Sequence, residues 1–354
     1  MINHLFTNRF TEGSVVSDIY VITDIRRGVT KSGKPYLSAN LLDARGSVAM
    51  IAWEYEGGIS PADNGELVAV TGLVTMYQDR PQLRVEQLTL QDAGGLSWED
   101  IEALVPSAPI DADVCSYYVW KMAQSIQDPE LNRLCNTLLE GHWEMFTTIP
   151  AGKSVHYAFR YGLLMHTADM LVLAEAIAAH HVDTVNRDLL VCGVLLHDFG
   201  KILEFELSPT TGLVKDYSPV GKLIGHSCLG AIEAAKAAAA LGISSQTEML
   251  VQHMLLSHHG NPAFGAAKEP MILEAEILHG LDMLDSRREI YTENLTDVQP
   301  GSCSCYIPAL EHAVYPSALL PGSSFVSGEN PGDTDKLTIP APDYYRLGGF
   351  RPAQ

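Results

Sequence analysis

The chain has 354 residues and a formal net charge of −20, because 43 aspartates and glutamates outnumber 23 lysines and arginines. An apolar content of 46% with a charged content of 19% excludes a disordered or fibrous chain, and the length is enough for two or three domains. The negative charge repels nucleic acid at long range, so a nucleic-acid-binding function would need a local basic patch.

The sequence carries no signal for a membrane or for export. The longest conspicuous apolar run, residues 189–196, falls well short of the roughly 18 residues that span a bilayer. The N-terminus, MINHLFTNRF, lacks the basic start and the apolar stretch of a signal peptide. Six scattered cysteines form no C-x-x-C pair, which argues against a disulfide scaffold or a zinc ribbon. We therefore expect a cytoplasmic protein that binds no membrane.

The N-terminal part predicts a small barrel. Five β-rich runs separated by glycine-rich or polar turns cover residues 14–27, 34–45, 46–55, 66–77 and 81–90. Five short strands in about eighty residues favour an OB-fold, which is the usual five-stranded barrel. We assign it to residues 1–91; an SH3-like barrel is the alternative.

The composition changes after the strands. Residues 92–112 are rich in glycine, proline and acids and predict a linker, whereas residues 113–299 predict an all-α domain. Its main helices are expected over residues 163–179, 186–198, 227–241, 245–257 and 271–292. Residues typical of helix ends frame the helical segments, with starts at Asp128-Pro129, Asn186 and Ser227 and stops at Gly242 and Gly260. Residues 300–354 form a tail in which 14 of 55 residues are proline or glycine.

Histidines and aspartates gather on the apolar faces and at the ends of these helices. Each taken alone could be an ordinary core or surface residue. Four separate helices nevertheless bring such residues to an apolar background, where an ionised carboxylate needs a partner, and a shared cation is the simplest common explanation. Mixed imidazole and carboxylate ligands suit Mn, Fe, Zn, Co or Ni but not Ca. The residues concerned are His166, His197, Asp198, His226, His258, His259, Asp282 and Asp285.

The order of these residues resembles a known family. His166, His197-Asp198 and Asp282 match the H…HD…D signature of the HD phosphohydrolase superfamily. With the preceding barrel, the segments GLLMHT, LLHDFGK, GKLIGHS, LLSHHG and EILHGLDMLDSR resemble the YhaM-type 3′–5′ exoribonucleases over residues 14–300. One departure is Tyr157, in His156-Tyr157-Ala158, where the family commonly has His-His-Ala.

The resemblance implies a multidomain protein, with an all-β OB-fold barrel followed by an all-α HD domain, and a site for two divalent metals, with Mn²⁺ favoured. One metal would take His166, His197, Asp198 and Asp282; the second would be bridged by Asp198 and held by His226 and by His258 or His259. Adjacent residues on a helix point about 100° apart, so His258 and His259 are not expected to share one role. Asp198 and Lys201 are the expected catalytic residues. Lys201 would contact a phosphate oxygen, or else pair with a helix C-terminus. Asp285 would support a ligand or pair with Arg287 or Arg288.

The barrel holds a candidate nucleic-acid-binding surface, although its 8 basic residues are outnumbered by 11 acidic ones over residues 1–95. Residues 25–42 contain four cations and no acid and are expected in the loop between strands 1 and 2, which OB-folds use for oligonucleotides. Aromatic side chains would stack on bases and arginines would bind phosphates. Alternatively, the cations are a solvated loop and the aromatics fill the barrel. The candidates are Arg26, Arg27, Lys31, Lys34, Tyr36, Trp53, Tyr77, Arg80 and Arg84.

The function that follows is a metal-dependent phosphodiesterase that degrades single-stranded nucleic acid from the 3′ end, with RNA favoured over DNA by the resemblance. One alternative is an HD-domain hydrolase of nucleotides or cyclic nucleotides with a regulatory barrel. Another is a non-catalytic single-strand-binding protein with a remnant metal site, against which the intact set of histidines and aspartates argues. The sequence leaves open whether the protein forms a homo-oligomer.

Overall fold

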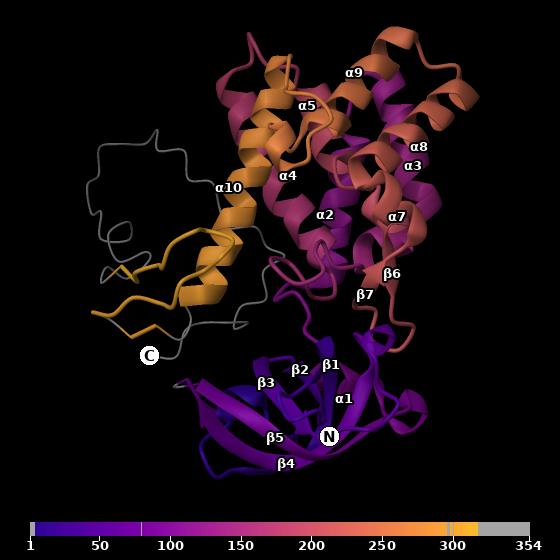
Figure 1. Ribbon diagram of the computed structural model, residues 1–354. Helices are drawn as coiled ribbons and strands as arrows, with labels where there is room; N and C mark the ends of the chain where they lie inside the picture. Colours follow the sequence, from indigo (N-terminus) through magenta and orange to yellow (C-terminus); the bar gives the residue numbers. More distant parts are fainter. Residues whose placement is uncertain (1–3, 79, 296–297, 300, 318–354) are drawn as a thin grey trace.

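The computed structural model describes residues 4–78, 80–295, 298–299 and 301–317. A five-stranded barrel lies at one end and a helical part at the other (Figure 1). Most of the predicted tail, from residue 318 onward, lies outside the described residues.

All five predicted strands are confirmed. They close a barrel in the order β1-β2-β3-β5-β4, antiparallel except for the β3–β5 pair, which is the OB-like architecture expected. The strands are β1 (Val15–Val29), β2 (Pro35–Asp43), β3 (Gly46–Trp53), β4 (Leu67–Tyr77) and β5 (Arg80–Leu90).

Strand β2 shows why the barrel closes around an apolar core. Its residues alternate, so that Leu37, Ala39 and Leu41 are buried while Tyr36 and Asn40 face outward. The interior is filled by large buried side chains from several strands, namely Tyr20, Ile22, Leu37, Leu41, Met50 and Leu83. The outward positions of β2 are therefore free to form a surface.

The segment predicted as a linker is partly helical. Helix α1 (Trp98–Leu104) begins after Ser97, whose side chain and that of Asp100 cap each other's backbone N–H groups. Ile101, Leu104 and Val105 are buried against barrel residues. Their i, i+3, i+4 spacing places them on one helix face, which the surrounding glycines, prolines and acids obscure in the sequence.

The rest of the described chain is mainly helical. The helices are α2 (Ala112–Gln124), α3 (Pro129–Thr148), α4 (Gly162–His180), α5 (Arg187–Leu196), α6 (Lys201–Glu204), α7 (Pro219–Ile224), α8 (His226–Leu241), α9 (Ser245–Ser257) and α10 (Leu273–Leu295). The predicted starts at Pro129 and Asn186 and the left-handed stop at Gly242 are confirmed.

The predicted N-cap at Ser227 is wrong, because α8 already begins at His226 and follows Gly225. The backbone N–H of His226 donates to Glu204 Oε1 at 2.9 Å. A carboxylate from another helix thus satisfies the donor that a hydroxyl cap would have satisfied.

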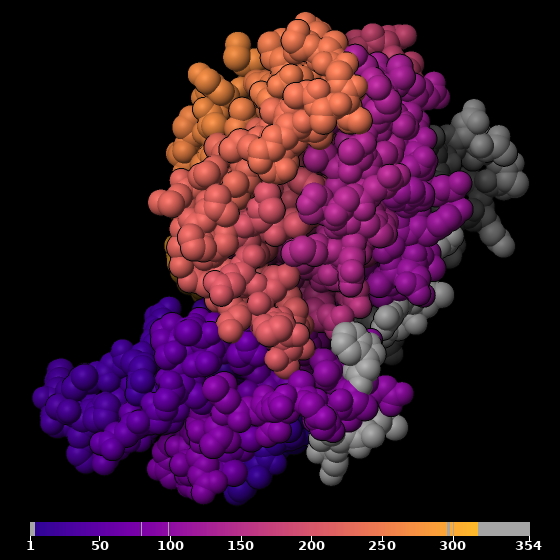
Figure 2. Space-filling model, turned by 90° about the vertical axis from the view of Figure 1, so that its right-hand side faces the viewer, coloured from indigo at the N-terminus to yellow at the C-terminus, as the bar shows by residue number. Residues whose placement is uncertain are grey.

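The helical domain also contains one short hairpin. Strands β6 (Phe205–Leu207) and β7 (Val214–Tyr217) pair antiparallel, and their connection reaches the barrel (Figures 1 and 2). There Thr211 Oγ1 donates to the carbonyl of Gly65 at 2.6 Å, and Lys215 Nζ lies 2.9 Å from Glu66 Oε1. Leu213 is buried in the same cluster as the apolar face of α1. The hairpin is therefore a joint between the two parts.

Helix α4 is, among the described residues, the one helix long and apolar enough to cross a membrane. In this fold 61% of its most apolar window is buried, and its interior carries His166. We assign α4 as the central core helix of the helical domain.

Residues 301–317 fold back onto the last helix. Ile307, Leu310 and Val314 form a small buried cluster with Ile290 of α10. This part of the predicted tail is therefore packed against α10.

Candidate metal centre

Five helices bring the predicted histidines and aspartates together. His166 comes from the middle of α4, His197 and Asp198 directly follow α5, and His226 is the first residue of α8. His258 and His259 directly follow α9, and Asp282 lies on α10. The four most buried are at most 3% exposed, namely His166, His197, Asp198 and His258.

The first cluster consists of His166, His197 and Asp282, whose ligand atoms all lie within 4.8 Å of one another. The Nε2 atoms of His166 and His197 are 3.2 Å apart, and His166 Nε2 lies 3.4 Å from Asp282 Oδ1. Residues separated by more than a hundred positions in sequence thus converge on one point.

The second cluster consists of His226, His258 and His259. His226 Nε2 lies 3.0 Å from His259 Nε2 and 3.4 Å from His258 Nε2. The expectation that His258 and His259 do not share one role stays a prediction. The structure places both imidazoles in this cluster, with ring centroids 4.1 Å apart, although His258 keeps a helical backbone.

Asp198 lies between the two clusters. Its Oδ2 is 3.3 Å from His197 Nε2 and 3.8 Å from His166 Nε2. Its Oδ1 is 3.4 Å from His226 Nε2 and 3.9 Å from His258 Nε2. One carboxylate therefore presents one oxygen to each cluster, which is the geometry expected of a bridging ligand.

The outer ring nitrogens of four histidines are occupied. The Nδ1 of His197 contacts the carbonyl of Val194 at 2.8 Å, and that of His258 contacts the carbonyl of Leu255 at 2.7 Å. The carboxylates of Asp285 and Glu204 accept from the Nδ1 atoms of His166 and His226, at 2.8 and 3.1 Å. Such second partners hold the tautomer and the orientation of metal-binding histidines.

The donor set fits divalent metals. A carbonyl can only accept, so Nδ1 of His197 and of His258 carries the N–H, which leaves Nε2 of each ring to face the clusters. Imidazole nitrogens and carboxylate oxygens that lie 3.0 to 3.9 Å apart need protons or cations between them, and both groups are ligands of divalent metals. The clusters are thus suited to two cations.

The carboxyl groups of the site are held in their ionised form. Burial would raise the pKa of Asp198, but Lys201 and His197 outweigh it and keep this pKa well below its usual range. The pKa of Asp282 is likewise depressed, because its bond to His166 outweighs burial. Burial lowers the pKa of His166, but bonds to Asp282 and Asp285 raise it to about 10, so a cation bound at this cluster would have to displace the proton from Nε2.

Lys201 pairs with the central carboxylate. Its Nζ donates to Asp198 Oδ2 at 2.6 Å, and the side chain is buried. Lys201 is the first residue of the four-residue helix α6, and both roles considered for it, a contact with phosphate and a pairing with a helix end, stay predictions.

One supporting residue, Glu204, escaped the sequence analysis, and for another, Tyr157, the sequence analysis gave no role. Glu204 holds both the backbone and the ring of His226, and its only signal was an acid in the apolar run KILEF. Tyr157 lies in neither cluster: its hydroxyl donates to Asp285 at 2.5 Å and accepts from Arg288 at 2.6 Å. Asp285 contacts both His166 and Arg288, the two kinds of contact expected for it.

Comparison with known proteins identifies the family to which this chain belongs. The family model of the HD domain matches residues 163–287. The chain is 33% identical over 301 residues to the 3′–5′ exoribonuclease YhaM of Geobacillus sp. (strain WCH70), across 83% of this chain and 90% of that protein. The chain belongs to the YhaM exoribonuclease family. It is a metal-dependent phosphohydrolase, and the HD domain implies that it binds divalent metal.

Solved structures match the barrel of this YhaM family member only distantly. Replication protein A bound to single-stranded DNA is 19% identical with a TM-score of 0.20, covering 26% of this chain and 68% of that one. The second OB-fold domain of replication protein A from Methanococcus maripaludis is 16% identical with a TM-score of 0.18, covering 26% and 93%.

The four predicted loop cations of the YhaM family member divide into two groups. Arg26 and Arg27 lie on β1, because this strand continues to Val29, so their assignment to the loop is wrong. Only Lys31 and Lys34 lie in the short turn before β2. Arg27 donates to the carbonyl of Gly57 at 2.9 Å, and Lys34 pairs with Glu54 at 2.5 Å.

The predicted aromatic residues lie outside the barrel interior. Tyr36 on β2 packs against Trp53 on β3 with ring centroids 5.6 Å apart. Trp53 is 54% exposed and Tyr77 is 59% exposed, which excludes the alternative that these two fill the barrel. Arg80, paired with Tyr77 across β4 and β5, is exposed as well.

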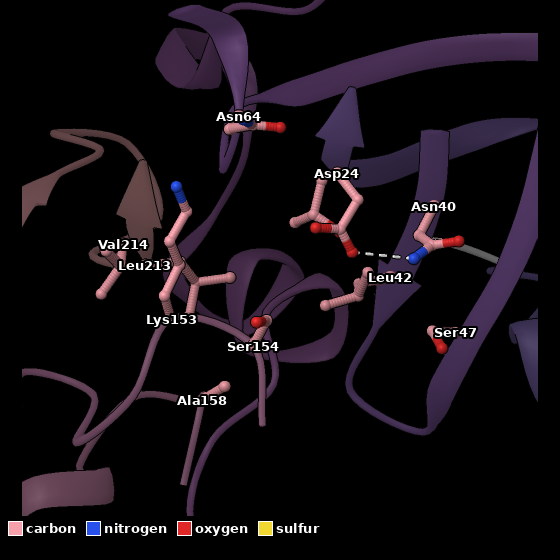
Figure 3. Close-up of a pocket in the computed structure, with 11 residues that line it drawn as sticks. Asp24, Asn40, Leu42, Ser47, Asn64, Lys153, Ser154, Ala158, Leu213 and Val214 are labelled. Carbon is pink, nitrogen blue, oxygen red and sulfur yellow. Dashed lines mark hydrogen bonds between the residues drawn. The ribbon is translucent and has the colours of Figure 1, made fainter. Parts of the chain in front are cut away.

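A pocket of about 150 Å³ lies between the barrel and the helical domain and is lined by residues of both (Figure 3). Asp24, Asn40 and Ser47 line its barrel side. The opposite side is formed by Lys153 and its neighbours in the segment between α3 and α4. Asn40 continues the outward row of β2 that carries Tyr36, so the pocket adjoins the surface with the exposed aromatics.

Proposed function

We propose that this protein hydrolyses single-stranded RNA from the 3′ end, using two divalent metal ions of which Mn²⁺ is the favoured species. The observation that carries the proposal is Asp198, a buried carboxylate with one oxygen facing each histidine cluster. Family membership supports it, since the Geobacillus relative is a 3′–5′ exoribonuclease. The proposed ligands are His166, His197, Asp198 and Asp282 for one metal, and Asp198, His226, His258 and His259 for the other.

Two bound divalent metals supply an activated water and stabilise the charge that develops on the phosphoryl oxygens. The protein's own part is orientation and charge. Glu204 and Asp285 keep His226 and His166 in place. Lys201 fixes Asp198 and brings a positive charge next to the reacting phosphate.

We assign the binding of the strand to the outer face of β1, β2 and β3. Tyr36 and Trp53 lie opposite each other across β2 and β3, and Arg26 lies opposite Ser38 one step along the same row. Trp53 is exposed and Tyr36 is half-buried against it, and an aromatic surface beside a cation is typical of sites on which bases stack. The pocket lined by Asn40 and Lys153 continues this face toward the helical domain.

A cytoplasmic location completes the proposal. All six cysteines are free thiols in the structure, as expected in a reducing compartment.

The function is tested by incubating the purified protein and Mn²⁺ with 5′-labelled single-stranded RNA, single-stranded DNA and small phosphoesters side by side. We expect the RNA to shorten stepwise from its 3′ end. Release of phosphate from mononucleotides without any shortening of RNA would refute the proposal. Metal analysis of the purified protein identifies the cations.

Strand binding is tested by reversing the charges of Arg26 and Lys31 to glutamate. Each lost phosphate contact lowers the slope of log affinity against log salt by about 0.7 for a single strand, so the double variant should bind RNA with a flatter slope. Lys236→Glu on α8 is the matched control and should change the slope much less. Equal slopes in wild type and double variant would contradict the assignment.

A further inference from the structure

The pocket between the barrel and the helical domain combines an apolar wall with a few polar groups. The wall is formed by four side chains, namely Leu42, Ala158, Leu213 and Val214. Two of the residues that line the pocket carry charge, Asp24 from the barrel and Lys153 from the segment between α3 and α4. Apolar walls with a small number of fixed polar groups are typical of sites that bind a small molecule or part of one.

Asp24 lies on a bulge of β1. Two residues of this strand, Asp24 and Ile25, lie opposite the single residue Ala39 of β2. Asp24 adopts a left-handed conformation with φ of 52°, which aspartate tolerates better than most residues. The carboxylate of Asp24 faces the pocket (Figure 3). Bulges re-aim side chains in this way beside functional sites.

Two asparagines hold the bulge in place. Asn64 Oδ1 accepts at 3.1 Å from the backbone N–H of Ile25, a residue that the bulge leaves unpaired. Asn40 Nδ2 donates to Asp24 Oδ2 at 2.9 Å (Figure 3). The other oxygen, Oδ1, has no hydrogen-bond partner within the described part of the chain, and Asp24 is exposed. This oxygen is therefore open to a ligand that enters from solvent.

Lys153 brings a positive charge to the opposite side of the pocket. Its Nζ lies 2.9 Å from Asp216 Oδ1, and Lys222 pairs with the other oxygen of the same carboxylate. One carboxylate balances only one of the two lysines, so a positive charge remains. An ammonium has three donors, so Lys153 can donate to a ligand while it keeps Asp216. The pocket thus presents an acceptor on the barrel side and a donor on the side of the helical domain.

This combination of charges matches one nucleobase. Guanine carries adjacent N–H donors on N1 and N2 that fit a carboxylate, and beside them the acceptors O6 and N7 that fit an ammonium. Adenine and cytosine each offer one exocyclic amino group, and the single N–H of uracil is flanked by carbonyls that a carboxylate repels. A carboxylate on a surface that binds a polyanion lowers general affinity, so recognition of a base is the role that explains Asp24.

We propose that the pocket binds a guanine base of the RNA strand, with Asp24 accepting from N1–H and N2–H and Lys153 donating to O6. This inference rests on the proposed function, since it assumes a single strand on the face of the barrel that adjoins the pocket. Asp24 is then a specificity-determining residue, because strands with a guanine are held more tightly than strands without one. A free guanine nucleotide offers the same chemistry, and the test separates the two sources.

The test measures the affinity of the full-length protein for fluorescently labelled RNA by anisotropy, in EDTA so that no strand is shortened. An oligoadenylate with one central guanine should bind about tenfold more tightly than the all-adenine strand. Inosine in place of the guanine lacks the N2 amino group and should lose part of this gain. Asp24→Asn should abolish the preference without weakening the binding of the all-adenine strand. Asparagine tolerates the same backbone and can still accept from Asn40.

Glu86→Gln is the matched control, since Glu86 is an exposed acid on β5 outside the pocket, and it should keep the preference for guanine. Equal affinity of the wild type for the two strands, or a preference that survives Asp24→Asn, overturns the inference. Tighter binding of guanosine monophosphate than of the strand would assign the pocket to a free nucleotide and overturn it as well. Failure of the wild type to shorten RNA in Mn²⁺ would refute the proposed function, whereas the affinities measured in EDTA would still decide the role of the pocket.

Discussion

At the scale of a single residue, Asp198 contacts both histidine clusters and Lys201. It is 3% exposed, ion-paired with Lys201, and within 3.9 Å of histidines from both clusters. Removing a buried charge partner leaves the other members of such a network uncompensated. A substitution here should therefore affect both clusters at once.

We expect Asp198→Ala to abolish hydrolysis and to remove most of the bound metal from both clusters. Helical circular dichroism should persist, because the surrounding core is apolar and extensive. Elemental analysis and circular dichroism of the purified variant check this. Asp188→Ala removes a carboxylate on the first turn of α5, the helix that ends just before Asp198; it is the control and should retain metal. Wild-type metal content in Asp198→Ala would rule out the bridging role.

At the scale of elements, Gly200 allows α6 and α8 to meet. A Cβ at this position would lie 1.9 Å from the carbonyl oxygen of His226 and 2.7 Å from the backbone nitrogen of Gly230. Gly200→Ala should therefore displace the start of α8, lowering the melting temperature and the metal content of the second cluster. Gly280→Ala, in a helix interior with open space, should be neutral or slightly stabilising. Equal effects of the two substitutions would contradict this explanation.

The N-terminal segment is joined to the barrel by a charged contact. His4 Nδ1 lies 2.9 Å from Asp18 Oδ2, and Nε2 lies 3.4 Å from Asp43 Oδ2. Burial lowers the pKa of His4, but the two aspartates outweigh it and raise this pKa to about 9. A raised pKa in the folded state stabilises fully below pH 6.5, and that stabilisation is lost as the pH rises through 9.

His4→Gln should therefore destabilise the barrel more at pH 6 than at pH 10, by about 2–3 kcal/mol at most. Thermal melting at the two pH values measures this difference. His180→Gln, at the exposed end of α4, should have little effect at either pH. If His4→Gln is equally destabilising at both, the contact is not an ion pair.

Local signals predicted most of these elements, and tertiary contacts account for the misses. The alternation of apolar and polar residues within strands and the helix caps at Asp128 and Asn186 could be predicted, because each depends only on residues close in sequence. Ser227 misled because Glu204, from a different helix, caps α8. The gathering of these histidines and aspartates could be predicted from the sequence, whereas their division into two clusters depends on how the helices pack.

At the scale of the whole molecule, the hairpin of β6 and β7 joins the helical domain to the barrel, and no sequence pattern predicted this contact. Leu213 is 3% exposed and packs in a cluster with Val21, Leu67 and Leu104. Leu213→Ala should cost roughly 2–5 kcal/mol, loosen the two parts and expose residues 92–112 to protease. Degradation of RNA should fall, while turnover of a small diester by the helical domain stays close to wild type.

Limited proteolysis and the two assays check this expectation. Leu223→Ala on α7 removes a leucine that is 85% exposed and serves as the control. Unchanged proteolysis and RNA degradation in Leu213→Ala would show that the joint does not couple the parts.

The position of Asp282 on α10, late in the chain, has a consequence for the synthesis of the protein. During synthesis, a ribosome that adds 5–20 residues per second needs about 6 to 23 s to advance from His166 to Asp282. The histidines of both clusters are complete once His259 has been added, but the first cluster still lacks the carboxylate that α10 supplies. Because the proposed hydrolysis uses both metals, we expect the growing chain to be inactive until α10 has been made.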